Sequence, residues 1–212
     1  MSSAGQARFG LSNRPRPRLA PRRVGILGGS FNPAHAGHLE ISRTALRKLG
    51  LDEVWWLVSP QNPLKPVTGM AALQDRLRSA RTLAKDPRIR VTSLEHELRT
   101  HYTADTLAAL RHRFPHTRFV WLMGADNLAD ISRWERWPQI FEGMPVAVLA
   151  RPSYSLKALA MKAARRFSKF RLPERAARRL VEQRPPAWVF VAGRLNPLSA
   201  TAIRRAQVNG RR

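Results

Sequence analysis

Short apolar runs alternate with longer amphipathic stretches along most of the chain. The apolar runs predict strands at 24–29, 54–58, 89–94, 119–123, 146–150 and 188–192. Apolar residues at three- and four-residue spacing predict helices at 39–49, 71–84, 103–113, 134–141 and 156–169, with a further helix after Ser199. Strands and helices are therefore expected to alternate from about residue 23 onward.

This alternation predicts an α/β fold. Strands that are joined through helices can lie parallel, and such crossovers are right-handed. We expect a doubly wound, mainly parallel sheet of Rossmann-like type, with helices on both faces and one domain in 212 residues. Ligands of such sheets bind beyond the carboxyl ends of the strands, where the strand order reverses. Residues that directly follow strands are therefore the first candidates for a functional site.

The charge is strongly one-sided, with 38 Lys and Arg against 14 Asp and Glu and a net charge of +24. Residues 1–22 are rich in Pro and Arg without apolar periodicity, so we expect a basic, disordered tail before a domain at 23–212. A second basic stretch covers 157–179. A positive field attracts anions, nucleic acid included, although a solvated tail and helix face is the simpler interpretation. Any nucleic-acid binding is expected to be non-specific.

Composition narrows the classes of protein further. The chain has no cysteine, which excludes disulfides, thiolate metal sites and a cysteine nucleophile. Its apolar runs are far shorter than the ~18 residues that span a bilayer. The basic N-terminal stretch lacks the apolar core of a secretory signal. We therefore expect a cytoplasmic protein without a membrane partner, and an oligomer stays open.

The stretch after the first predicted strand is the most informative. It reads Gly28-Gly29-Ser30-Phe31-Asn32-Pro33-Ala34-His35-Ala36-Gly37-His38. Glycines let the backbone approach a ligand, and free amides at a helix start favour an anion. The two histidines are three residues apart, so on a helix they would lie on one face and could donate to the same phosphate. The alternative is a Gly-rich turn with two incidental histidines.

A second polar segment, Leu198-Ser199-Ala200-Thr201-Ala202-Ile203-Arg204, lies near the far end of the chain. Hydroxyls and free amides at a helix start, with an arginine one turn later, suit a polyphosphate. Taken alone, the segment is better explained by a serine that caps an ordinary C-terminal helix. Coupled to the paired histidines, the phosphate interpretation is favoured.

Together the two segments resemble the nucleotidylyltransferase superfamily, whose members join a nucleotide monophosphate unit to an organic phosphate. The histidine segment resembles its His-x-Gly-His signature, and the later segment resembles its Ile-Ser-Ser/Ala-Thr-x-Ile-Arg element, with Leu198 as a mild departure. The resemblance implies that His35, His38 and Arg204 are catalytic. It also implies an ATP site formed by Gly28, Gly29, Ser30, Phe31, His35, His38, Gly124, Asp126, Ser199, Thr201, Ile203 and Arg204.

Segments in the middle of the chain narrow the resemblance to the nicotinate-nucleotide adenylyltransferase family, which makes the deamido form of NAD. The segments that carry this resemblance are the loop at 59–65, the Tyr-Thr-x-Asp-Thr pattern at 102–106, the Gly-x-Asp at 124–126 with the later Trp134, and Arg151-Pro152. The resemblance covers about residues 24–206. It implies that Asn62, Lys65, Thr103 and Trp134 contact nicotinate mononucleotide.

Besides Leu198, the sequence departs from this family at three positions, and some residues have structural alternatives. Ser30 and Asn32 replace the commoner Thr and Asp, and His101 stands where a small Ser is usual. Thr103 could act only as the N-cap of the following helix. Asp126 could be a turn residue, and Trp134 and Trp137, at helical spacing, could both be core residues.

We expect direct transfer, in which the 5′-phosphate of the acceptor attacks the α-phosphorus of ATP and pyrophosphate leaves. No metal ligand is predicted, because Mg²⁺ is expected to bind mainly through the ATP phosphates. Nicotinamide mononucleotide and phosphopantetheine remain alternative acceptors. A non-catalytic RNA-binding protein on the same fold is the alternative from a different class.

Overall fold

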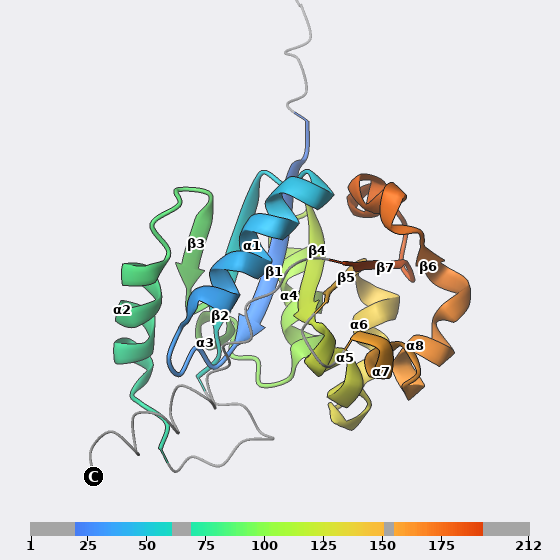
Figure 1. Ribbon diagram of the computed structural model, residues 1–212. Helices are drawn as coiled ribbons and strands as arrows, with labels where there is room; N and C mark the ends of the chain where they lie inside the picture. Colours follow the sequence, from blue (N-terminus) through green and yellow to red (C-terminus); the bar gives the residue numbers. More distant parts are fainter. Residues whose placement is uncertain (1–19, 61–68, 151–154, 193–212) are drawn as a thin grey trace, which may run out of the picture.

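The computed structural model describes residues 20–60, 69–150 and 155–192. In these residues, seven parallel strands form one sheet in the order β3-β2-β1-β4-β5-β7-β6 (Figure 1). The strands are β1 (Arg22–Gly29), β2 (Glu53–Val58), β3 (Ile89–Thr92), β4 (Thr117–Gly124), β5 (Val146–Leu149), β6 (Arg171–Leu172) and β7 (Trp188–Val191). The predicted doubly wound α/β class is confirmed.

Helices occupy the segments between the strands. The α-helices are α1 (Ala36–Leu49), α2 (Leu73–Leu83), α3 (Leu94–Glu97), α4 (Thr103–Arg113), α5 (Ala125–Asp130), α6 (Trp137–Gly143), α7 (Ser155–Leu159) and α8 (Lys162–Arg166). The described residues also form the 3₁₀ helices η1 (Ile131–Arg133), η2 (Ser168–Phe170) and η3 (Glu174–Glu182). No helix of the described ranges is both long and apolar enough to cross a membrane.

The strands separate two apolar layers because their side chains alternate between the two faces of the sheet. On β2, Trp55 and Leu57 join the layer that contains α4, α5 and α6, whereas Val54, Trp56 and Val58 join the layer of α1, α2 and η3. Figure 1 shows α1 in front of the sheet and α4 behind it. Since both faces are covered, all six residues of β2 are buried.

The strand order reverses next to β1. The chain runs from β1 outward through β2 to β3, and α4 then returns it to β4 on the other side of β1. The pairing of β1 with β4 extends to Leu27 and Leu122, each two residues before the end of its strand. The turn after β1 and the start of α5 therefore lie at the same edge of the sheet, where ligands of this fold class bind.

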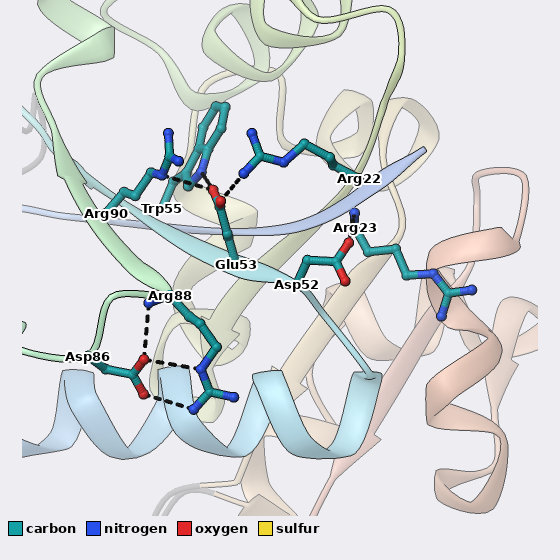
Figure 2. A network of polar contacts seen from close by, with 8 residues as sticks. All are labelled: Arg22, Arg23, Asp52, Glu53, Trp55, Asp86, Arg88 and Arg90. Carbon is teal, nitrogen blue, oxygen red and sulfur yellow. Dashed lines mark hydrogen bonds and ion pairs between the residues drawn. The ribbon is translucent and has the colours of Figure 1, made fainter. Parts of the chain in front are cut away.

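The opposite, amino-terminal edge is held by ion pairs (Figure 2). Glu53, only 8% exposed, accepts hydrogen bonds from Arg22 and from the Trp55 indole at 2.8 Å, and it pairs with Arg90 at 3.0 Å. This carboxylate joins the first residues of β1 and β2 to β3. The network fixes three neighbouring strands far from the reversal point.

The predicted strands are all present, with ends shifted by at most two residues, but one strand end and one helix start were predicted wrongly. The strand predicted to reach Leu94 ends at Thr92, and Leu94 begins α3. The helix predicted at 134–141 begins at Trp137, because Arg136 adopts a left-handed conformation with φ of 50°. Trp134 therefore lies in extended backbone after η1 rather than on a helix.

The long helix predicted at 156–169 was also wrong, because the chain breaks it into α7, α8 and η2. Ala158 and Ala163 are both fully buried against the same apolar layer. On one continuous helix, residues five apart would point about 140° away from each other. The break between α7 and α8 lets both side chains face the core.

Candidate active site

The turn between β1 and α1, residues 30–35, is held in an unusual backbone conformation. Phe31 has a φ of 47°, in the left-handed region, which costs a non-glycine residue roughly 1–2 kcal/mol. Its ring is 1% exposed, stacks on Trp56 with centroids 5.1 Å apart, and lies 4.5 Å from the ring of His38. Burial of this ring fixes the turn and offsets the backbone strain.

The two predicted histidines meet at the start of α1. His35 is the N-cap and precedes the helix, and its Nδ1 accepts a hydrogen bond from the amide of Gly37 at 3.2 Å. His38 Nδ1 accepts from the amide of His35 at 3.1 Å, which completes a capping box built from two imidazoles. The ring centroids are 3.9 Å apart. They are therefore neighbours, although by capping rather than by sharing a helix face.

This arrangement decides which ring nitrogen carries the proton. A nitrogen that accepts a hydrogen bond from an amide is unprotonated, so a neutral imidazole in this box has its proton on Nε2. Ser42 supports His38, because its hydroxyl donates to the carbonyl of His38 at 2.8 Å and accepts from the Trp56 indole at 2.7 Å. In the neutral tautomer that this box selects, Nε2 is the protonated nitrogen of both rings.

Gly28 has a packing role that the sequence did not indicate. A Cβ at this position would lie 2.5 Å from Cη2 of Trp121, closer than real side-chain contacts. Glycine is therefore required here by the indole on β4. A contact of the Gly28 and Gly29 backbone with ATP stays a prediction.

Gly124 and Asp126 lie across the reversal point from the histidines. Gly124 ends β4 as the N-cap of α5, and Asp126 follows in the first turn of that helix. Gly124 is buried, and Asp126 is partly exposed. The structure thus brings the predicted residues that follow β1 and β4 to the same edge of the sheet.

The predicted acceptor residues Thr103 and Trp134 are carried by segments that contact each other. Thr103 is the first residue of α4, and Tyr102 is the N-cap, so the alternative that Thr103 serves as the N-cap is wrong. Arg136 pairs with Asp105 at 2.5 Å, and its guanidinium lies 5.5 Å from the Tyr102 ring. Trp134 is partly buried against the core, whereas Trp137 is 7% exposed. Arg136, which the sequence did not single out, therefore joins the two segments.

The remaining predicted residues lie outside the described part of the chain. They are Asn62, Lys65, Arg151, Pro152, Ser199, Thr201, Ile203 and Arg204. Most of the basic tail and the predicted helix after Ser199 also lie there. These positions stay predictions.

Two buried ionisable residues near this edge were missed by the sequence reasoning. Arg76 on α2 is 2% exposed, and burial lowers the pKa of its guanidinium. Glu95 on α3 is 8% exposed, and loss of water raises the pKa of its carboxyl, although a hydrogen bond with the Ser59 side chain opposes that rise. Nothing in the local sequence distinguishes either residue from a solvated one. In the described ranges, no three or more His, Asp and Glu side chains form a group that could hold a metal ion.

Comparisons with known proteins agree with the predicted family. Residues 26–206 match the cytidylyltransferase-like family. A probable nicotinate-nucleotide adenylyltransferase of Cereibacter sphaeroides is 56% identical over 181 residues, which cover 85% of this chain and 95% of the relative. The corresponding proteins of Methylorubrum extorquens and Brucella suis are 53% and 48% identical, over 86% and 87% of this chain and 98% and 95% of their own.

Solved structures with low sequence identity share the fold. The nicotinic acid mononucleotide adenylyltransferase of Plasmodium falciparum, complexed with APC, has a TM-score of 0.63 at 15% identity, over 87% of this chain and 83% of that chain. The same enzyme complexed with NaAD has a TM-score of 0.64 at 16% identity, over 87% and 83%. The family match and the close relatives go further: this chain belongs to the nicotinate-nucleotide adenylyltransferase family and is a nucleotidyltransferase of NAD biosynthesis.

Proposed function

We propose that this protein transfers the AMP moiety of ATP to nicotinate mononucleotide, giving deamido-NAD and pyrophosphate. The observation that carries the proposal is the histidine capping box beside the point where the strand order reverses. Two imidazole Nε2–H groups at the start of α1, where the helix dipole favours negative charge, are suited to a phosphate. The names of the close relatives support the same acceptor.

The reaction we propose is a direct displacement. A phosphate oxygen of the acceptor forms a bond to the α-phosphorus of ATP, the bond from that phosphorus to the bridging oxygen of pyrophosphate breaks, and no covalent enzyme intermediate forms. Such transfer depends on alignment and charge stabilisation, so it needs no activated cysteine or serine. His35 and His38 donate from Nε2 to oxygens of the α- and β-phosphates as charge moves to pyrophosphate.

The outer phosphates are assigned to the far end of the chain. Ser199, Thr201, Ile203 and Arg204 form the second part of the ATP site in this proposal, with Arg204 on the β- and γ-phosphates. ATP enters as its magnesium complex, so the ion is part of the substrate. Gly124 and Asp126 complete the nucleotide site from the β4 side.

Nicotinate mononucleotide is assigned to Asn62, Lys65, Thr103 and Trp134. The Tyr102 side chain makes no capping bond to the first turn of α4, so amides at this helix start are candidates to receive the ring carboxylate. A carboxylate gains more from such amides than the carboxamide of nicotinamide does, which favours the acid form. The cytoplasmic location, non-specific nucleic-acid binding and any oligomer stay predictions.

The test is pyrophosphate release from magnesium ATP with one acceptor at a time. Purified full-length protein is supplied with nicotinate mononucleotide, nicotinamide mononucleotide or phosphopantetheine. We expect release with nicotinate mononucleotide to be strongly preferred. A preference for another acceptor would overturn the substrate but keep the chemistry, and no release from folded protein with any of the three would overturn the activity.

A further inference from the structure

Arg76 is a buried cation whose hydrogen bonds go to the backbone. It lies on α2 with 2% of its surface exposed, and loss of water lowers the pKa of its guanidinium. Burying a charge is costly unless hydrogen bonds replace its water. Among the described residues, no carboxylate pairs with it. The environment that keeps this charge buried is therefore made of carbonyl oxygens.

Those carbonyls belong to three separate segments. Arg76 Nη1 donates to the carbonyls of Ser30 and Ser59, both at 2.7 Å. Its Nη2 donates to Pro60 at 2.8 Å, and its Nε donates to Ala71 at 2.9 Å. Four of the five N–H groups of the guanidinium are therefore used. One side chain joins the β1–α1 turn, the carboxyl end of β2 and the residues that lead into α2.

Further contacts tie the same segments together. The Ser59 amide donates to the carbonyl of Gly29 at 2.9 Å. The Asn32 side chain donates to the Gly69 carbonyl at 3.0 Å and accepts from the Ala71 amide at 3.3 Å. These bonds join the segments in pairs, whereas the Arg76 guanidinium bonds to all three. Its rigid planar fork suits such bridging, whereas a lysine ammonium is a compact charge on a flexible stem.

We propose that Arg76 is a positioning residue for adenylyl transfer. It holds the β1–α1 turn, which carries the histidines, at a fixed place relative to the carboxyl end of β2, and thereby aligns ATP with the acceptor. The inference rests on the proposed function. It gives Arg76 no contact with substrate, because the residue is 2% exposed and four of its five N–H groups donate to the carbonyls of Ser30, Ser59, Pro60 and Ala71.

The kinetic test compares Arg76→Lys and Arg76→Gln with Arg78→Lys and Arg78→Gln. Arg78 lies on the same helix, its side chain is 77% exposed, and it pairs with Asp75. A misplacement of about 1 Å can cost on the order of 10²-fold in rate, so we expect kcat of both Arg76 variants to fall by roughly 10- to 100-fold. Each KM should change by less than about threefold, since binding groups remain present. The Arg78 variants should match the wild type.

Two outcomes of this kinetic test would overturn the inference. One is a wild-type kcat in folded Arg76→Lys and Arg76→Gln protein. The other is a rise in KM with kcat unchanged, which would indicate weaker binding rather than lost alignment. Rates are calculated per folded molecule, from thermal unfolding of the same preparations, so that a mere loss of stability does not lower kcat.

A second measurement keeps the inference separate from the proposed function. Hydrogen exchange is followed at the Ser59 and Ala71 amides, which are bonded to Gly29 and Asn32. We expect faster exchange at both amides in the Arg76 variants and no change in the Arg78 variants. Unchanged exchange would overturn the anchoring by Arg76 even if the enzyme were active. An inactive wild type with faster exchange in the variants would overturn the proposed function and, with it, the positioning role, while leaving the anchoring intact.

Discussion

Buried charged side chains have different kinds of partner at the two edges of the parallel sheet. At the amino edge, Glu53 is surrounded by Arg22, Arg90 and the Trp55 indole, and Asp86 pairs with Arg88 at 2.9 Å (Figure 2). At the carboxyl edge, the buried Arg76 is bonded to carbonyls. Charged side chains are therefore paired with opposite charges at the amino edge and hydrogen-bonded to backbone carbonyls at the carboxyl edge.

We therefore expect the amino edge to contribute mainly to stability and the carboxyl edge mainly to the reaction rate. An ion-pair network neutralises its own field, so it can fix strands but offers little to an anionic substrate. Hydrogen bonds from a cation to carbonyls leave the positive charge in place and fix the backbone instead. In this account, damage to the amino edge lowers stability with little change in rate per folded molecule, whereas damage to the carboxyl edge lowers the rate.

The largest effect is expected from His38→Ala at the carboxyl edge. Loss of a donor to the developing charge predicts a fall in kcat on the order of 10²-fold or more. His112→Ala, an exposed residue in the last turn of α4, is the matched control and should keep the wild-type rate. The measurement is steady-state pyrophosphate release. A rate near wild type in folded His38→Ala protein would remove this histidine from the chemistry.

Glu53→Gln tests the amino edge of the sheet, where we expect a loss of stability. The substitution replaces one of the two acceptor oxygens by an NH2 group that would face other donors, and the loss is expected to cost about 1–3 kcal/mol of unfolding free energy. Both arginine side chains are about half exposed, which keeps the effect at the lower end of that range. Urea unfolding measures it. A tenfold fall in kcat per folded molecule, with unchanged stability, would contradict the separation of the two edges.

His35 allows capping and catalysis to be separated at a single position. Asparagine is a favoured N-cap and retains an acceptor for the Gly37 amide, so His35→Asn should preserve stability, whereas His35→Ala should cost about 1 kcal/mol. Both substitutions remove the imidazole donor and should lower kcat to a similar extent. Thermal unfolding and pyrophosphate release are compared for the two variants. If His35→Asn were as active as the wild type, His35 would be only a cap.

The smallest predicted effect is a pH dependence that involves Glu95. Because burial raises the pKa of this carboxyl above its ordinary value of 4.5, the folded protein binds its proton more tightly than the unfolded chain does. The free energy of unfolding should therefore fall as the pH rises from 4.5 through the raised pKa. Below that window, the carboxyl is protonated in both the folded and the unfolded chain, so its burial does not cost the free energy of desolvating a charge.

Glu95→Gln removes this titration and should flatten the stability curve across the window. In urea unfolding, the free energy of unfolding of Glu95→Gln should exceed that of the wild type by a margin that grows with rising pH. Glu97→Gln, on the exposed side of α3, is the control. A wild-type curve that rises with pH relative to Glu95→Gln would contradict the direction of the shift.

Much of the fold could be predicted because β-strands in a doubly covered sheet are continuous apolar runs. β2 is the clearest case, with six consecutive buried residues. η3 was missed although Ala177, Leu180 and Val181 are buried at three- and four-residue spacing, because basic residues surround them. The break between α7 and α8 was missed because the core, rather than a proline or glycine, imposes it.

The site could be predicted only in part. The spacing of His35 and His38 predicted that the rings lie close together, but it did not predict that each accepts from a backbone amide. Arg76 occupies an ordinary position on an amphipathic helix, and its carbonyl partners Ser30 and Ser59 lie 46 and 17 residues away in the sequence. Contacts of this kind depend on the assembled sheet, so no local pattern reveals them.

Direct transfer of the adenylyl group to nicotinate mononucleotide can be tested by following that group itself. The wild-type protein is incubated with magnesium ATP labelled at the α-phosphate and with equal concentrations of nicotinate mononucleotide and nicotinamide mononucleotide, and the labelled products are separated. We expect the label to appear mainly in deamido-NAD, with none attached to the protein. Label that accumulates mainly in NAD or on the protein, or that forms no dinucleotide, would contradict direct transfer to nicotinate mononucleotide.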